Sequence, residues 1–447
     1  MGILNLRSIT YTRIIALSFV AVILIGSILL TLPISSANRA FTPYTDALFT
    51  ASSSVCVTGL VVYDTYTHWS LFGKIVILAL IQIGGLGFMI TISTFVIFTR
   101  KRISLKERKL LMESSGTMRL DGVIALVKRI IRGTILIESL GALCLMIRFC
   151  PQMGFWNGLF YAIFHSVSAF CNAGFDIMGK FGQFCSLTGY SGDALVNIVI
   201  MMLIIIGGIG FTVWDDILQN KHHFKKYTLH SKIVLFTTAI LIAGGMVLFF
   251  IFEYNASMSG MDLKHRLLCS AFQSVTPRTA GMNTIDLTAL SNGGYLLTLV
   301  LMFIGGSPGS TAGGIKTTTL ALLIINAMTV SRNDNSVVAF KRRIDDSSIR
   351  RASAIFVLYV IAILLSVIIL SSVEPHGFKA IVFEVVSALG TVGLSLGITP
   401  DLTTPAKIIL SFLMFMGRVG GLSLMLVISE HKKSAKLERP KGRILIG

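Results

Sequence analysis

The sequence predicts an all-α membrane protein built from four copies of one unit: a transmembrane span, a re-entrant pore loop and a second span. Only 13% of its 447 residues are charged and 53% are hydrophobic, with a mean hydropathy of +0.79, whereas an ordinary soluble domain has roughly 25% charged residues. The apolar residues gather in eight runs of about 20, the length that crosses a bilayer core. Turns ending in glycine recur between paired runs. A water-soluble fold is therefore excluded, and we expect eight transmembrane helices plus four re-entrant pore helices.

The apolar runs come in pairs, and each pair defines one repeat. The first run is too long for the apolar core of a signal peptide and has no A-x-A cleavage pattern after it, so we expect it to be a membrane span. The runs are Ile14–Leu32, Lys74–Phe98, Ile130–Phe149, Asn197–Ile217, Ile233–Phe252, Tyr295–Asn326, Ala354–Val373 and Ala406–Ser429. The expected repeats are residues 1–99, 100–220, 221–340 with an intramembrane loop at 305–316, and 341–430, followed by a cytoplasmic tail at 431–447.

The net charge of +18, from 39 Lys and Arg against 21 Asp and Glu, is confined to five segments. Because basic loops stay in the cytoplasm, we expect these segments to share that side, which makes both termini cytoplasmic. The basic cytoplasmic surface that results is explained by its role in fixing the membrane topology and by contact with anionic membrane lipids. No nucleic-acid partner is therefore expected. The segments are Met1–Arg13, Arg100–Arg132, Asp215–Lys232, Asn326–Ala352 and Glu430–Gly447.

Within each pair, a short helix-like stretch leads into a turn of small residues that ends in glycine. The turns are Val55–Gly59, Phe170–Gly174, Pro277–Gly281 and Leu389–Gly393, and their last glycines are spaced by 115, 107 and 112 residues. A second glycine landmark follows each turn, at Gly84–Gly87, Gly207–Gly210, Gly305–Gly306 and Gly417–Gly420. Two features that repeat in register indicate a repeated structural unit.

Four non-helical turns at membrane depth predict a central pore. Such backbone is tolerated in a membrane only where it is buried in protein or lines a water-filled cavity. Around a pseudo-fourfold axis, the carbonyl groups of the turns would face one another and could replace the hydration shell of a cation. Glycine permits the backbone conformations that this requires. The short helices point their partly negative C-terminal ends at the turns, which also favours cations.

At these residues the sequence resembles the Trk/Ktr/HKT superfamily of potassium transporters, and the similarity extends over Thr10–Ser429. Among the branches of this superfamily, the chain is most similar to the bacterial Ktr membrane subunit. It has eight expected spans and lacks the two additional N-terminal helices that are typical of Trk. The shared features are the four turn glycines Gly59, Gly174, Gly281 and Gly393, the segment Gly305–Gly314 and the stretch Gly417–Gly421.

The resemblance implies channel-like potassium uptake across the cell membrane by a subunit that is not an enzyme. Glycine in all four turns implies a preference for potassium over sodium. Potassium is the expected ligand, with no organic cofactor in this chain. The implied partners are a second copy of the chain in a homodimer, a separate cytosolic ring of nucleotide-binding regulatory subunits, and membrane lipids. The implied filter residues are Val57, Thr58, Gly59, Asn172, Ala173, Gly174, Thr279, Ala280, Gly281, Thr391, Val392 and Gly393.

The sixth apolar run, Tyr295–Asn326, is expected to be broken by the segment Gly305–Gly314. We expect this break only in the third repeat. As one helix the run would be ~48 Å long, beyond a bilayer core of ~30 Å. The resemblance implies an intramembrane gate, whereas a plain helix kink is the alternative. Gly309–Lys316 superficially resembles a phosphate-binding loop, but Ile315 separates the glycine from the lysine, so nucleotide binding is not expected. The implied gate residues are Gly305, Gly306, Ser307, Pro308, Gly309, Ser310, Thr311, Ala312, Gly313, Gly314, Lys316 and Arg418.

Arg418 stands where the other repeats have Gly85, Gly208 and Gly306. A charge in mid-span is costly and by default indicates a function. One interpretation is a structural ion pair with Glu138, the acidic residue of the third span. The other is that Arg418 contacts the gating loop and raises the electrostatic barrier for cations.

Two further function classes are less consistent with this pattern. A sodium- or proton-coupled secondary cation transporter is the alternative, but inverted halves would then be expected rather than four repeats in one orientation. A membrane-embedded enzyme would need converging catalytic groups, and away from their ends the spans contain only three charged residues, Glu138, Lys316 and Arg418. The six cysteines show no CxxC spacing, so a transition-metal site or a disulfide is not expected.

Overall fold

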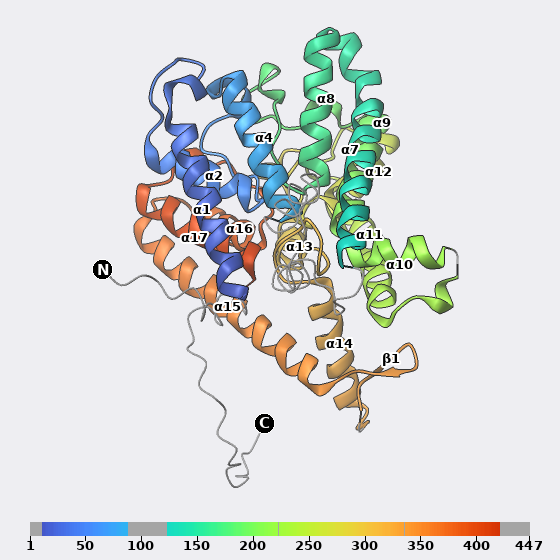
Figure 1. The fold of residues 1–447 in the computed structure, drawn as a ribbon. Helices are drawn as coiled ribbons and strands as arrows, with labels where there is room; N and C mark the ends of the chain where they lie inside the picture. Colours follow the sequence, from blue (N-terminus) through green and yellow to red (C-terminus); the bar gives the residue numbers. More distant parts are fainter. Residues whose placement is uncertain (1–10, 88–122, 222, 335, 421–447) are drawn as a thin grey trace.

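The computed structural model describes residues 11–87, 123–221, 223–334 and 336–420, and these form an almost entirely helical body with one small β-hairpin (Figure 1). Some sequence predictions lie outside the described residues. They concern residues 88–98 and 421–429 of two expected spans, the expected tail 431–447, and the basic residues at 1–10 and 100–122.

The first helix of each expected pair is long. Within the described ranges, four helices are long and apolar enough to cross a membrane unbroken, and each matches the first apolar run of one pair. They are α1 (Tyr11–Thr31), α7 (Val123–Met153), α11 (Leu229–Glu253) and α15 (Asp346–Val373). The chain is therefore a multi-pass membrane protein.

Each long helix is followed by a short helix and then by a second apolar helix. The short helices are α2 (Tyr44–Val55), α8 (Phe155–Phe170), α12 (Leu263–Val275) and α16 (Phe378–Gly390). The second helices are α4 (Leu71–Leu86), α9 (Ala194–Gly208), α13 (Asn292–Phe303) and α17 (Thr404–Val419). The other elements are α3 (Thr65–His68), α10 (Phe211–Asn220), α14 (Thr317–Ser331), six short 3-10 turns, and the antiparallel pair β1 (Val338–Ala339) and β2 (Arg342–Arg343).

The expectation that the third repeat alone has a broken second span is wrong. The run Asn197–Ile217 was expected to be continuous, but α9 and α10 meet at a bend of 96°. Gly210 lies at this bend with φ +99°, and α4 and α17 end at glycines with similar values, Gly87 at +85° and Gly420 at +92°. A left-handed glycine is a common helix C-terminal signal. The second glycine landmark therefore marks the ends of helices as well as the register of the repeats.

The same landmark also explains how the second helices pack. At three positions a Cβ atom would overlap a backbone carbonyl oxygen of the short helix in the same repeat, so the second helix lies directly against the end of the short helix. The pairs are Gly84 with Val55, Gly207 with Phe170, and Gly417 with Leu389. In the third repeat a Cβ on Gly305 would instead overlap the carbonyl oxygen of Gly313, in the segment that follows α13.

Side-chain caps fix where the second helices begin. Ser70, Asp193 and Ser291 each accept hydrogen bonds from the first free N–H groups of α4, α9 and α13, which satisfies donors that have no partner within the helix. Ser291 also donates its backbone N–H to the buried carboxylate of Glu253 at 3.0 Å. The end of α11 is thereby tied to the start of α13.

One ion pair joins the two ends of the chain. Lys407 Nζ on α17 lies 2.8 Å from Asp46 Oδ1 on α2, with both side chains about nine-tenths buried. Tyr63 Oη donates to the other carboxylate oxygen at 2.7 Å. Since α2 also packs against α17, the first and last repeats are in contact.

We expect Lys407→Met to lower the free energy of unfolding by roughly 3 kcal/mol, because a buried carboxylate loses its charge partner. Thermal unfolding in detergent measures the change. Arg343→Gln is the matched control: its pair with Asp346 is 3.9 Å long and exposed, so its loss is expected to cost at most about 1 kcal/mol. Equal melting temperatures for Lys407→Met and the wild type would contradict the assigned role.

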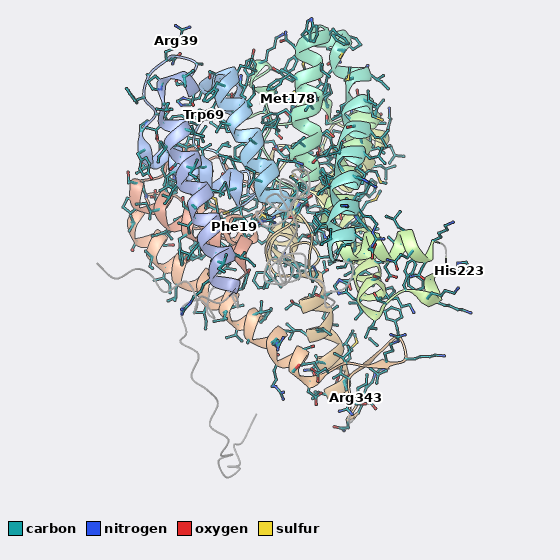
Figure 2. All side chains as sticks on the ribbon, in the orientation of Figure 1. Phe19, Arg39, Trp69, Met178, His223 and Arg343 are labelled. Carbon is teal, nitrogen blue, oxygen red and sulfur yellow. The ribbon has the colours of Figure 1, made fainter. Side chains whose placement is uncertain are left out.

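The two ends of the molecule differ in composition. Figure 2 places Arg39 and Met178 toward one end of the helical body and His223 and Arg343 toward the other. Two of the five basic segments, Asp215–Lys232 and Asn326–Ala352, include α10 and the β-hairpin, and both lie at the second end (Figure 1). This arrangement agrees with the sequence-based expectation that the basic segments share one side.

Candidate functional site: four glycine turns above a broken helix

The four glycine turns share one backbone conformation. In each, the last residue is a glycine with positive φ, at +94°, +73°, +76° and +91° for Gly59, Gly174, Gly281 and Gly393. The residue two positions earlier is also left-handed, although none is glycine: Val57, Asn172, Thr279 and Thr391 have φ of +51°, +56°, +72° and +52°. Left-handed backbone is strained for such side chains, and strain of this kind gathers at functional sites.

The four turns meet in a closed ring. A Cβ added to Gly59 would lie 2.7 Å from the carbonyl oxygen of Ala173, and one added to Gly174 would lie 2.9 Å from that of Ala280. Cβ atoms on the other two glycines would overlap the next carbonyl oxygens in order, Gly281 with Val392 and Gly393 with Thr58. Each turn therefore presents the carbonyl oxygen of the residue before its glycine to the glycine of the neighbouring turn. Segments more than 300 residues apart in sequence close the circle.

Hydroxyl groups behind the turns hold this conformation. Ser53 and Ser387 accept the N–H of Gly59 and Gly393, both at 3.0 Å. In the second repeat Ser168 donates to the carbonyl oxygen of Phe175 at 2.6 Å. All of these side chains are buried. The sequence alone does not mark these serines, although each lies six residues before the glycine of its turn.

His165 and Glu384 belong to the short helices α8 and α16, nine residues before the glycines of the second and fourth turns. His165 Nδ1 lies 2.7 Å from the carbonyl oxygen of Tyr161, and Glu384 accepts a hydrogen bond from the hydroxyl of Thr399. Both side chains are buried. Neither side chain lines the cavity that the four turn glycines share.

A cavity of about 240 Å³ lies on one side of the ring, and all four turn glycines line it. Three acidic residues, Asp64, Asp176 and Asp286, share its wall. Burial raises the pKa of Asp176 to about 6, and the neighbouring charge of Asp64 adds to the rise. At neutral pH the cavity therefore carries negative charge next to the ring.

On the other side of the ring lies the segment 304–316, between α13 and α14. It is hydrogen-bonded to three other parts of the protein. Two bonds come from its backbone, Ser307 N–H to the carbonyl oxygen of Gly208 at 2.9 Å and Gly314 N–H to that of Gly417 at 3.3 Å. The third comes from a side chain, Thr311 Oγ1 to the carbonyl oxygen of Phe170 at 3.0 Å. A Cβ on Gly313 would overlap Thr391 Oγ1. The segment therefore lies directly against the turn of the fourth repeat.

Two cationic side chains hold the segment in place. Lys316 Nζ donates to the carbonyl oxygens of Ala312 at 2.8 Å and Gly313 at 3.2 Å. Arg418 donates to the carbonyl oxygen of Thr311 and, on the other side, to those of Gly84 and Gly85. Arg418 thus bridges the segment 304–316 to the end of α4.

The ion pair between Arg418 and Glu138 is not formed among the described residues. Glu138 instead accepts a hydrogen bond from Gln82 Nε2 at 3.2 Å, and Cys171 Sγ lies 3.5 Å from Gln82 Oε1. This polar cluster lies just behind the second turn. The sequence singles out Glu138 as the acidic residue of the third span. It does not indicate that Gln82 and Cys171 form a cluster with Glu138, because nothing in the spacing of residues 82, 138 and 171 indicates contact.

The described residues contain no group of three His, Cys, Asp or Glu side chains arranged to hold a metal ion. The turns instead offer neutral oxygen atoms. The hydroxyl groups of Thr58, in the first turn, and Thr391, in the fourth turn, are buried and have no hydrogen-bond partner among the described residues. Backbone carbonyl and hydroxyl oxygens are ligands suited to a dehydrated alkali cation.

The fold and this arrangement of four backbone turns define a class of protein, the multi-pass membrane proteins that transport cations. The family model described as "TrkH: Cation transport protein" matches residues 4–439. The chain belongs to this family.

The names of similar proteins agree with this assignment. The chain is 41% identical to "Potassium/sodium uptake protein NtpJ" of Enterococcus hirae, over 99% of this chain and 98% of that protein. It is 42% identical to "Ktr system potassium uptake protein B" of Bacillus subtilis, over 98% and 97%. The solved structure of the potassium transporter TrkH from Vibrio parahaemolyticus has a TM-score of 0.74 at 19% identity, covering 96% of this chain and 87% of that one. That likeness shows the fold.

Proposed function

We propose that this chain is the ion-translocating subunit of a channel-like potassium uptake system in the cell membrane, and that it is not an enzyme. The proposal rests chiefly on one observation, the closed ring in which the carbonyl oxygens of Thr58, Ala173, Ala280 and Val392 face the four turn glycines. We assign these turns as the selectivity filter, with the four repeats arranged around it. The sodium- or proton-coupled secondary transporter remains the alternative.

Several features favour potassium as the transported ion. The ring consists of neutral carbonyl oxygens, which replace a hydration shell without binding the ion too tightly to release it. The short helices end at the turns, so that their partly negative ends face the ring. The acidic cavity beside the ring would concentrate cations. The relative at 42% identity is named a potassium uptake protein and the one at 41% identity a potassium/sodium uptake protein.

We assign the segment 305–316, together with Arg418, as the gate. The segment lies against the ring and is bonded to the ends of α9 and α17, so an ion that has passed the ring meets it next. The many hydrogen bonds of the segment argue against a plain helix kink, which would need only to satisfy its own backbone groups.

Replacing Arg418 by glutamine is expected to raise the rate of uptake. A cation ~7 Å from a fixed positive charge meets a barrier of roughly 2 kcal/mol at an effective dielectric constant of ~20, or about thirtyfold in rate before screening by water. Tracer uptake into liposomes measures the rate, and thermal unfolding reports the fold. Arg418→Lys keeps the charge and should keep the low rate. If the lysine and glutamine variants transported equally fast, charge would not be the barrier.

The orientation and assembly proposed here are those that the sequence predicts. We propose that the end bearing α10 and the β-hairpin faces the cytoplasm, since its segments are basic. A homodimer, and a separate cytosolic ring of nucleotide-binding subunits, are proposed on the resemblance to Ktr proteins.

Uptake of potassium, rubidium and sodium tracers into liposomes containing the purified chain tests the proposed function. We expect saturable uptake of potassium and rubidium, with much slower uptake of sodium. Uptake that requires an imposed sodium or proton gradient would favour the secondary transporter. Equal uptake of all three ions would contradict the proposed filter.

A further inference from the structure

A second cavity, of about 600 Å³, lies between α11, α14 and the β1–β2 hairpin. It is separate from the cavity beside the glycine ring and shares no residue with it. Its volume falls within the range usual for small-molecule sites, roughly 300–1,000 Å³. The function proposed above gives it no role. Its lining residues include Phe236 from α11, Met328 from α14, and Val338 and Phe340 from the hairpin.

The wall of this cavity is apolar and remains uncovered. Phe236, Met328, Val338 and Phe340 are 58%, 55%, 50% and 43% exposed, and the rings of Phe236 and Phe340 meet edge to face at 6.1 Å. Apolar side chains are exposed on many helices of this membrane protein, so the distinguishing feature here is that they line a cavity instead of a flat outer face.

The cavity is formed before anything binds. Beneath it, Ile233 of α11, Ala321 of α14 and the hairpin residues Val337, Ala339 and Ile344 form one buried cluster. This cluster fixes the hairpin to the two helices. A preformed wall lowers the cost of ordering protein groups when a ligand binds.

The turn of the hairpin is unusual for its sequence. Phe340 and Lys341 connect the two strands, and both have positive φ, +49° and +63°. Two-residue turns of this conformation normally use Asn-Gly or similar pairs. A large aromatic residue is therefore kept at a strained position, where it lines the cavity.

The open edge of the cavity has an arginine without an ion-pair partner in the described part of the chain. Arg332 lines it and is exposed, and among the described residues no ion pair is formed with its guanidinium. Lys341, Arg342 and Arg343 follow along the hairpin, outside the cavity lining. Three acidic residues belong to the same stretch: Asp334, which lines the cavity, and Asp345 and Asp346, which follow the hairpin. Together with Arg332, the stretch has four basic residues against three acidic ones, and basic side chains near a membrane surface attract anionic lipid.

The cavity also lies at the level where apolar and polar surroundings meet. Its α11 residues, Ile233, Phe236 and Thr237, belong to the first turns of that helix, just after the basic residues Lys225 and Lys226. Its polar rim lies beyond the end of α14. A ligand there would have its apolar part at the edge of the hydrocarbon and its polar part among headgroups.

We propose that this cavity binds an anionic phospholipid, with an acyl chain against Phe236 and Phe340 and the phosphate at Arg332. The proposal relies on the cytoplasmic orientation proposed above, and on neither the filter nor the gate. An amphiphile fits the combination of an apolar wall and an arginine at its edge, whereas a free phosphate would leave the aromatic wall exposed.

Native mass spectrometry of the delipidated full chain tests this proposal. It would be titrated with phosphatidylglycerol, with phosphatidylcholine of the same acyl chains, and with glycerol 3-phosphate. We expect the first phosphatidylglycerol to bind at least fivefold more tightly than phosphatidylcholine, and glycerol 3-phosphate to compete poorly. Arg332→Gln should remove the preference, and Ala321→Phe, which fills the cavity, should weaken both lipids.

Matched variants are Arg350→Gln, an exposed arginine on α15, and Ala327→Phe, an exposed alanine on α14; neither lines the cavity. Both should bind like the wild type. Equal binding of the two lipids by the wild type, or a preference that survives Arg332→Gln, would overturn the proposal. Full competition by glycerol 3-phosphate would indicate a site for free phosphate. Loss of a dimer in Ala321→Phe with unchanged lipid binding would assign the cavity to a second copy of the chain. Because Arg332 is exposed, its variant is expected to fold even if Ala321→Phe does not.

Discussion

Gly393→Ala is expected to reduce the preference for potassium over sodium by at least about tenfold, which corresponds to about 1.4 kcal/mol. The added Cβ would overlap the carbonyl oxygen of Thr58, one of the four that form the ring, and would approach Gly59 Cα to 2.8 Å. The φ of +91° also strains any residue other than glycine. The carbonyl must therefore turn away or the ring must widen, and both weaken its fit to a dehydrated ion. The ratio of rubidium to sodium tracer uptake measures the effect, with Gly59→Ser as a second variant.

Gly377→Ala is the matched control for this prediction. Gly377 belongs to the same repeat, has an ordinary φ of −63°, and has no atom within 4 Å of an added Cβ. It should transport like the wild type. If Gly393→Ala folds and keeps the wild-type ratio of potassium to sodium uptake, the assignment of the filter is wrong.

Deleting residues 307–314 is expected to raise potassium uptake about tenfold or more and to make it less dependent on a cytosolic partner. The segment lies against the turn of the fourth repeat, so its removal would take away the proposed obstruction and leave the residues of the ring in place. The two ends are already adjacent: Ile304 and Ile315 form a β-bridge, and Thr317 N–H donates to the carbonyl oxygen of Gly306 at 3.0 Å. A short connection can therefore replace the loop.

A smaller change tests the same gate with less risk to the fold. Thr311→Val removes the hydrogen bond from Thr311 Oγ1 to the carbonyl oxygen of Phe170 and should raise uptake moderately. Thr329→Val is the control, since the hydroxyl of Thr329 bonds only to its own helix, at Ile325. If the deletion variant is folded and its uptake is unchanged or abolished, the segment is a structural kink.

The sequence was sufficient to predict the order of long and short helices, because each depends on a local run of apolar residues and on a turn that ends in glycine. It also indicated that Arg418 would not be an ordinary surface arginine, since a charge in an apolar run must find partners. The backbone carbonyl oxygens of Gly84 and Gly85 are such partners.

Other features could not be predicted from the sequence because they depend on contacts between distant segments. The salt bridge between Lys407 and Asp46 joins residues 361 positions apart. The bend between α9 and α10 could not be predicted, because apolar residues continue on both sides of Gly210. Glycine in an apolar run is compatible with a continuous helix, and its left-handed conformation is visible only in three dimensions.

Locating the transported ion tests the central claim most directly. Crystals of the full chain grown with rubidium or thallium would show the ion by its anomalous scattering. We predict the strongest site at the ring, coordinated by the carbonyl oxygens of Thr58, Ala173, Ala280 and Val392. An ion bound instead near Glu138 or at the break between α13 and α14, with none at the ring, would contradict the account.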